Sequence, residues 1–362
     1  PERNIQTGGF SYKYDKCDMH SNPEAIAAQE TYLRDLVKHT NPYTGLAYKD
    51  DPSIVGFEIN NEPCHSGTKE EVKAYINRML KSMSKAGNRK PVFYNVSHNG
   101  YVAEAYYETT VQGTTYQWYP IGLVSGQTQQ GNFLPYVDRY DIPFAGKVKE
   151  FNKKARMIYE FDPADIMYSY MYPAMVRTFR TAGFQWITQF AYDPIDLAFA
   201  NTEYQTHFLN LAYTPNKAIS MKIAAEAARS LKRGESYGSY PQDTIFGNGF
   251  RVSYAEDLSE LNNGEKFYYS NQTNTPPKDA SKLVSIAGCG SSPIVDYEGT
   301  GAYFIDLNKI SADKLEKKGV KKAAAYYNHD HTHTSLKGAH MNAKSIAEGL
   351  KKSDCPLKEY LK

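Results

Sequence analysis

The sequence predicts an α/β protein with a parallel sheet, and two observations support this. Apolar segments of strand length, at 54–60, 91–99, 114–120, 155–162 and 184–192, alternate with segments in which apolar residues recur at helical spacing. Polar residues stand repeatedly where these strands end. Alternating strands and helices favour a parallel sheet, and chemistry gathered at strand ends is typical of an α/β barrel.

The helices expected between the strands cover residues 23–39, 69–86 and 165–181. Asn22 is a suitable N-cap for the first of them, with Pro23 at its first helical position. The second is amphipathic and ends at Gly87. One helix is therefore expected before the first predicted strand in the sequence and another after it.

The strand at 54–60 is rich in β-branched and aromatic residues and is expected to be buried on both faces. It runs into Asn60, Asn61, Glu62 and Pro63. Pro63 lacks a backbone donor and disfavours helix at Glu62, so the strand must stop there. Glu62 is therefore expected at the C-terminal end of a buried strand. The alternative interpretation is a carboxylate that caps the following helix.

A second glutamate occupies the matching position on another strand. Met157, Ile158 and Tyr159 form a short apolar strand, and Glu160 follows at its end. Two such carboxylates suit retaining glycoside hydrolysis, in which one protonates the leaving oxygen and the other attacks the anomeric carbon, with the carboxyl groups roughly 5–5.5 Å apart. The alternative for Glu160 is a salt bridge to a neighbouring Lys or Arg.

These residues resemble a known family. Asn61-Glu62-Pro63, preceded by the lead-in 41–52, is similar to the acid/base motif on the fourth strand of the barrel glycoside hydrolases that include family five endoglucanases and β-mannanases. Glu160 is similar to the nucleophile on their seventh strand. The resemblance covers residues 1–230 and implies a partial (β/α)8 barrel, strands four to eight, in a domain spanning 1–233. Strands one to three have no counterpart in the sequence.

The resemblance also implies substrate-binding residues, namely Asn61, His98, Trp118, Tyr119 and Trp186. Asn61 would hydrogen-bond the sugar 2-hydroxyl, or simply stabilise a turn. Trp186 would stack beneath the cleaved sugar, or belong to the core. Related proteins often carry histidine where this chain has Gln117, which leaves the subfamily open.

Beyond the barrel, residues 234–303 predict a small antiparallel β-sandwich. Short strand-like segments at 250–252, 266–269, 283–286 and 294–297 are separated by turn residues such as Asn262-Asn263-Gly264. This part resembles the small sandwich that often follows such barrels.

Residues 304–362 resemble the C-terminal end of rhamnogalacturonan acetylesterases, serine esterases with a flavodoxin-like α/β fold. A short strand is expected at 303–306 and helices at 312–318 and 338–351. Asp330 and His333 match the acid and base of the family. The nucleophile motif Gly-Asp-Ser occurs nowhere in the sequence, so we expect no esterase activity. His329, His331 and His333 alternate, which on a strand would suit zinc, but the resemblance accounts for the segment better and implies neither metal nor cofactor.

Composition limits the partners and the compartment. The 42 basic and 40 acidic residues nearly cancel, which argues against nucleic acid as a partner. The four cysteines have no metal-binding or redox spacing, and a disulfide between Cys17 and Cys64 is compatible with the sequence without following from it. We expect no membrane span. The family resemblance implies a secreted or periplasmic protein, although the chain begins at Pro1 with no recognisable signal peptide.

Three functional hypotheses follow. The first is a retaining O-glycoside hydrolase of a plant-type β-linked polysaccharide, a β-mannan or a β-glucan, with activity impaired by the absent early strands. The second is an acetyl esterase of pectic sugars, argued from the tail. The third is a non-catalytic chimeric product in which two gene pieces are joined. The sugar, the linkage, endo or exo action and the oligomeric state do not follow from the sequence.

Overall fold

The computed structural model describes residues 9–97, 102–121, 129–138, 140, 142, 144–164, 166–192, 209, 214–242, 244–293, 307–327, 334–353, 358, 359 and 361. The chain divides into two compact units. The first contains residues 1–261, 268–274 and 288–292, and the second contains 262–267, 275–287 and 293–362. The units are described separately below.

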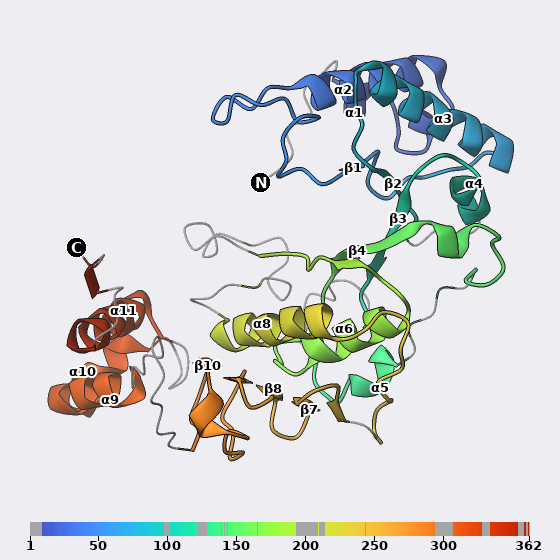
Figure 1. Ribbon diagram of the computed structural model, residues 1–362. Coiled ribbons are helices and arrows are strands. Elements are labelled where there is room, and N and C mark those ends of the chain that lie inside the picture. Colours follow the sequence, from blue (N-terminus) through green and yellow to red (C-terminus); the bar gives the residue numbers. More distant parts are fainter. Residues whose placement is uncertain are drawn as a thin grey trace. The chain divides into compact units, whose positions relative to one another are not determined.

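Five parallel strands form the sheet of the first unit and lie in chain order. They are β1 (Phe57–Glu58), β2 (Val92–Asn95), β3 (Gly113–Trp118), β4 (Ala155–Phe161) and β5 (Trp186–Ile187). Figure 1 labels the first four of them. Each connection between neighbours passes through helical segments, as parallel pairing requires. The predicted α/β fold with a parallel sheet is thus confirmed. Closure of these strands into part of a barrel stays a prediction.

Strand β1 is much shorter than the predicted strand 54–60, and that prediction is wrong for its first half. Val55 is 62% exposed and lies outside the strand. Pairing with the β2 segment begins at Phe57, whose backbone N donates to Pro91 O at 2.9 Å. It continues at Ile59, whose backbone N donates to Phe93 O at 3.2 Å. Apolar composition alone did not extend the strand, because its length is set by the backbone of its partner.

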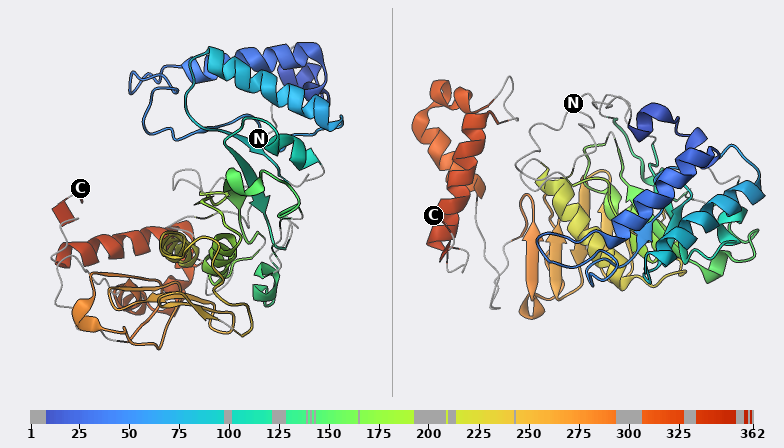
Figure 2. Two further views of the ribbon diagram at one scale, coloured as in Figure 1. Left: turned by 45° about the vertical axis from the view of Figure 1, so that its right-hand side comes forward. Right: turned by 90° about the horizontal axis from the view of Figure 1, so that it is seen from above.

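The first helices confirm the predicted segments 23–39 and 69–86 and the predicted N-cap at Asn22. Helix α2 (Pro23–Lys38) begins at Asn22, whose side chain accepts from Glu24 N and Ala25 N. Helix α3 (Lys69–Lys85) begins with a capping box between Thr68 and Glu71. The two helices pack side by side (Figure 2). Shorter segments complete this region: α1 (Phe10–Lys13), η1 (Asp18–His20), α4 (Ala103–Tyr107), α5 (Leu134–Val137) and η3 (Phe151–Lys153).

Helix α6 (Met171–Thr181) is buried along most of its length and packs against α8 (Pro215–Ser230). It begins six residues later than predicted, because Ser169 N donates to Asp257 Oδ1 at 2.6 Å instead of entering a helix. Strand β5 is also shorter than the predicted 184–192. Beyond it, Thr188 N still donates to Ile158 O at 2.8 Å and Phe190 N to Phe161 O at 3.0 Å, so the chain stays beside β4.

One glycine is required by close packing inside the sheet. A Cβ atom on Gly113 would lie 2.3 Å from the Phe93 ring and 2.8 Å from Ala155 O. These distances are too short for any side chain, so Gly113 lets β2, β3 and β4 pair at this level.

A second, five-stranded sheet follows, in the order β10-β9-β8-β7-β6. Its strands are β6 (Ile245–Phe246), β7 (Phe250–Ser253), β8 (Leu258–Asn262), β9 (Lys266–Tyr269) and β10 (Ser285–Gly288), with η4 (Ala280–Lys282) before the last. Pairing is antiparallel from β6 to β8. In the first unit, α8 reaches this sheet through a 3.0 Å hydrogen bond between Ser220 and Ser259. The described residues form one sheet here, so the second sheet of a sandwich stays a prediction; the predicted strand 294–297 lies outside them.

The second unit ends in helices α9 (Leu307–Lys318), α10 (Val320–Ala323), η5 (Ala324–Tyr326) and α11 (Leu336–Lys352). The predicted helices 312–318 and 338–351 are thus confirmed, each a few residues longer than expected. The predicted strand 303–306 lies outside the described residues. In the part of the chain that the structure describes, no helix combines the length and the apolarity needed to cross a membrane.

Candidate active site

Glu62 lies just beyond β1 on a turn with a left-handed backbone, φ 47°. Its backbone N donates to Asn95 Oδ1 at 3.3 Å, which fixes the turn to the end of β2. The Glu62 side chain is 34% exposed, and its Oε1 accepts a 3.1 Å hydrogen bond from Gln117 Nε2 on β3. A non-glycine residue held at positive φ is uncommon and is often found at functional sites.

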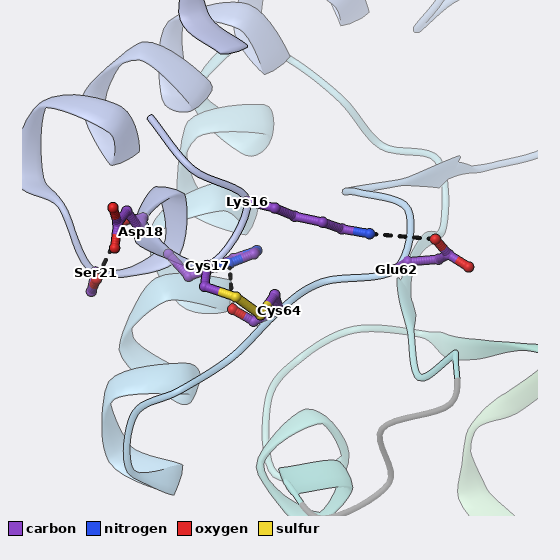
Figure 3. Close-up of a disulfide and its surroundings, with 7 residues drawn as sticks. Lys16, Cys17, Asp18, Ser21, Glu62 and Cys64 are labelled. Atoms are coloured by element: carbon purple, nitrogen blue, oxygen red, sulfur yellow. Dashed lines mark hydrogen bonds and ion pairs between the residues drawn. A yellow bond between two sulfur atoms is a disulfide. The ribbon is translucent and has the colours of Figure 1, made fainter. Parts of the chain in front are cut away.

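Lys16 contacts the other carboxylate oxygen of Glu62. Its Nζ lies 3.3 Å from Glu62 Oε2, and Figure 3 shows the lysine side chain extended towards the glutamate. The neighbouring Cys17 forms a disulfide with Cys64, with Cα atoms 4.7 Å apart. The sequence left this pairing open. Cys17 directly follows Lys16, and Cys64 lies two residues after Glu62. The disulfide between them therefore holds Lys16 beside Glu62.

Glu160 lies near the end of β4, in register with Gln117 on β3. Tyr119, which is 8% exposed, donates its hydroxyl to Glu160 Oε1. Burial, and after it the hydrogen bond to Glu160, raises the pKa of Tyr119. Tyr119 therefore stays protonated and acts as a fixed donor to this carboxylate.

A register shift between β3 and β4 brings Tyr159 and Glu160 to the same site. Tyr116 pairs with Ile158, but the next residue, Gln117, pairs with Glu160. Without the shift, neighbouring side chains on β4 would point to opposite faces. Here the Tyr159 hydroxyl donates to Gln117 Oε1, while Gln117 Nε2 holds Glu62. Ser97 also donates to Gln117 Oε1, at 3.0 Å.

Tyr159 lies among the carboxylates of the site. Burial raises the pKa of Tyr159, followed by the charge of Glu160, and Glu62 and Glu58 raise it further. One hydroxyl is therefore within electrostatic reach of all three glutamates. Gln117, which the sequence marked only as a departure from related proteins, is the side chain that joins Tyr159 to Glu62.

Glu58 is a member of this site that the sequence analysis missed. Its Oε1 accepts from Asn95 Nδ2 at 2.7 Å and from Thr115 Oγ1 at 3.0 Å. Burial raises the pKa of Glu58 to about 7; the charge of Glu160 raises it too, and the two hydrogen bonds oppose the rise. The available signal was a carboxylate between Phe57 and Ile59, since a charged residue inside an apolar strand is rarely structural alone.

The predicted substrate-binding residues have different outcomes. Tyr119 lies in the site, and Asn61 lies on its surface as an exposed residue beside Glu62. The neighbouring Asn60, not Asn61, is anchored: its Nδ2 lies 3.2–3.4 Å from His20 Nε2, Tyr75 Oη and Tyr94 Oη. His98 lies outside the described residues.

The two tryptophans are not brought to the glutamates. Trp118 packs against Tyr140 and Phe179, with ring centroids 4.7 and 5.5 Å away, because alternation along β3 turns it away from Gln117. Trp186 pairs with Met157, three residues before Glu160, and is 50% exposed. Trp186 therefore lies beside the middle of β4 and not beside its C-terminal end, where Glu160 is.

The esterase-like residues Asp330 and His333 lie outside the described residues, as do His329 and His331. Within the described ranges, no group of three or more His, Cys, Asp or Glu side chains is arranged to hold a metal ion.

Comparison with known proteins gives a partial likeness in structure. No family model and no curated protein matches the sequence. An endo-1,4-beta-mannanase from Rhizomucor miehei is similar, with 19% identity, 61% of this chain and 65% of that chain covered, and a TM-score of 0.44. A family 5 mannosidase from the same organism has 14% identity, with 59% of this chain and 61% of that chain covered and a TM-score of 0.46. An endo-beta-1,4-mannanase from Thermotoga petrophila has 12% identity, with 71% of this chain and 57% of that chain covered and a TM-score of 0.44. The chain spans less than two thirds of the length of these enzymes, so its activity has to be argued from its own residues.

Proposed function

We propose that this chain carries the site of a retaining β-glycoside hydrolase that acts on a plant-type polysaccharide, a β-mannan or a β-glucan. The observation that carries the proposal is the Tyr159–Gln117 pair. The Tyr159 hydroxyl hydrogen-bonds Gln117 Oε1, Gln117 Nε2 hydrogen-bonds Glu62 at 3.1 Å, and Gln117 lies in register with Glu160. Two carboxylates at the ends of two parallel strands, one held by Gln117 and the other in register with it, suit double displacement.

In this mechanism Glu160 attacks the anomeric carbon and Glu62 gives its proton to the departing glycosidic oxygen. The bond from carbon to the leaving group breaks as the bond to Glu160 forms. Glu62, now ionised, then takes a proton from water, whose oxygen displaces Glu160 and releases the sugar. The Tyr119 hydrogen bond orients the Glu160 carboxylate, and the Gln117 hydrogen bond orients Glu62.

The test is covalent trapping, which detects the nucleophile even where turnover is slow. A 2-deoxy-2-fluoro-β-mannosyl or -glucosyl fluoride should leave a glycosyl adduct on the peptide that contains Glu160, detected by mass spectrometry. Glu160→Gln should abolish the adduct. Trp118→Phe is the matched control on a neighbouring strand and should keep it. No adduct with either sugar, or an adduct on another residue, would contradict the proposal.

A further inference from the structure

The C-terminal helices concentrate positive charge that the whole-chain balance hides. Ten of the chain's 42 basic residues, all of them lysine, lie in the described stretches 307–327 and 334–353, but only three of its 40 acidic residues do. The remainder of the chain is therefore net acidic, although the total is +2. Segregated charge of this kind indicates a local partner of opposite sign.

The lysines gather around one hollow of about 630 Å³ in the second unit. We call it the lysine pocket; its lining residues are Lys314, Lys317, Lys318, Tyr326, Lys337, His340, Met341 and Lys344. They come from α9, η5 and α11, which pack together (Figure 2). The hollow has the size of known small-ligand sites, roughly 300–1,000 Å³.

The geometry of the helices fixes this pocket. A Cβ atom on Gly338 would lie 2.0 Å from Tyr326 O, so glycine allows α11 to approach η5 closely. Ser335 caps α11 by accepting from Gly338 N at 3.3 Å, and it donates to Ala325 O at 2.9 Å. Lys314 joins α9 to α11 through Ser345 at 3.0 Å and Glu348 at 2.9 Å.

Most of the charge in the lysine pocket is uncompensated. Lys314 has Glu348 as a partner, and Lys344 is close enough for its charge to act on Glu348 as well. Among the described residues, Lys317, Lys318 and Lys337 form no ion pair. The ammonium groups of Lys318 and Lys337 lie 5.3 and 4.9 Å from the centre of the Tyr326 ring. The ring attracts these cations and holds them in the pocket. Like charges crowded in this way repel one another, and an anionic ligand relieves the repulsion.

We propose that the lysine pocket binds an acidic oligosaccharide, a short stretch of a sugar chain that carries carboxylates. The lysine ammonium groups are spread over the hollow. They can each pair with one carboxylate of a flexible sugar chain that carries a single carboxylate on each acidic unit. Tyr326 and Met341 supply apolar surface between those charges, which suits the C–H faces of sugar rings. The choice of a carbohydrate among anionic chains rests on the proposed function.

Two other anionic partners fit these features less well. Bidentate recognition of phosphates and bases in nucleic acids favours the arginine fork, and the described residues of 307–353 contain no arginine. A membrane surface would meet a flat face with apolar side chains around the charges, whereas the lysines here line a concave hollow. DNA and anionic vesicles therefore serve as opposing arms of the test.

The experiment measures binding to the full chain by titration calorimetry. Oligogalacturonates of three to five units are the probe, and neutral manno-oligosaccharides of equal length, inorganic phosphate, single-stranded DNA and phosphatidylserine vesicles are the comparisons. We expect oligogalacturonate to bind, with affinity that falls as salt rises, and each comparison to bind at least tenfold more weakly. Tighter binding of DNA, vesicles or phosphate would overturn the proposal.

Matched variants locate the site. Lys318→Gln with Lys337→Gln should weaken oligogalacturonate binding at least tenfold. Lys351→Gln with Lys352→Gln changes the charge by the same amount on α11 outside the pocket lining, and should change affinity less than threefold. Equal losses in both pairs would mean diffuse attraction and would overturn the proposal. Glu160→Gln should leave this binding unchanged, so a failure of the glycosidase proposal is distinguishable from a failure of this one.

Discussion

At the scale of single residues, Glu58 has the most unusual surroundings in the site. It sits in a two-residue strand and accepts hydrogen bonds from Asn95 and Thr115, both fully buried. Asn95 in turn accepts from the backbone N of Glu62. Glu58 therefore supports the turn that carries Glu62, the proposed general acid, through the side chain of Asn95.

The pKa of Glu58, about 7 against an ordinary 4.5, predicts how stability varies with pH. A carboxyl whose pKa is raised in the folded state stabilises the fold fully below pH 4.5, and that contribution is lost as pH rises through 7. Glu58→Gln keeps the hydrogen-bond acceptor without the charge. Relative to wild type, it should gain roughly 1–3 kcal/mol between pH 4.5 and pH 8, measured by urea unfolding at both values. A pH-independent difference between the two proteins would contradict this assignment.

Lys16 allows a second test at the residue scale. The ammonium of Lys16 lies 3.3 Å from Glu62 Oε2, the carboxylate oxygen that Gln117 does not hold, and so competes with a sugar oxygen for that atom. Both side chains are partly exposed, so the ion pair should contribute little to stability, about 0–1 kcal/mol. We expect Lys16→Gln to leave the unfolding midpoint in urea nearly unchanged and to raise turnover of an aryl β-glycoside. Lys13→Gln, on the neighbouring helix α1, is the control. Loss of turnover in Lys16→Gln alone would show that the lysine serves the reaction.

At the scale of elements, the sequence predicted helices better than strands. Helix α2 follows from its cap at Asn22, and α3 follows from its apolar spacing and the stop at Gly87, signals that lie in or next to each helix. Strands β1 and β5 were predicted too long, since their lengths depend on partners far along the chain. The same applies to the site. The ends of two strands located Glu62 and Glu160, but no local pattern reveals the register shift that gathers Tyr159, Gln117 and Glu160.

The segment around the disulfide contains two buried histidines that behave as an acid-sensitive element. His20 and His65 are 8% and 5% exposed, with ring centroids 4.4 Å apart. Burial lowers the pKa of His20 to about 4 and that of His65 to about 3. His20 Nδ1 donates to Cys64 O and its Nε2 accepts from Asn60 Nδ2, so the neutral ring suits its site.

These depressed pKa values predict a loss of stability in acid. The contribution of the neutral histidines is complete above pH 6.5 and is lost as pH falls towards 4 for His20 and 3 for His65. Thermal unfolding at pH 7 and pH 4.5 should show a smaller loss for His65→Gln than for wild type. His39→Gln, at an exposed histidine, should follow wild type. If all three proteins lose stability equally, the buried pair is not the cause.

At the scale of the whole molecule, charge and chemistry are separated along the chain. The glutamate site lies in the first unit and the lysine pocket in the second. Near-neutral total charge is the sum of a net acidic part and a basic one, which is why composition alone argued against any polyanionic partner. The two sites can therefore be tested independently by substitutions in different units.

The last prediction concerns turnover by the chain as it stands, which we expect to be weak. Hydrolysis needs both carboxylates held within about 0.5 Å of their working positions by a rigid surrounding shell, and a misplacement of about 1 Å can cost on the order of a hundredfold in rate. Glu62 follows β1, which pairs only with β2 among the described strands. The Glu62 side chain is 34% exposed, so part of the shell that would hold its carboxylate is solvent. Aryl β-mannoside and β-glucoside should both be turned over slowly, with Glu160→Gln as the background control. Rapid wild-type turnover that Glu160→Gln removes would show that the five parallel strands hold a fully organised site without further support at β1.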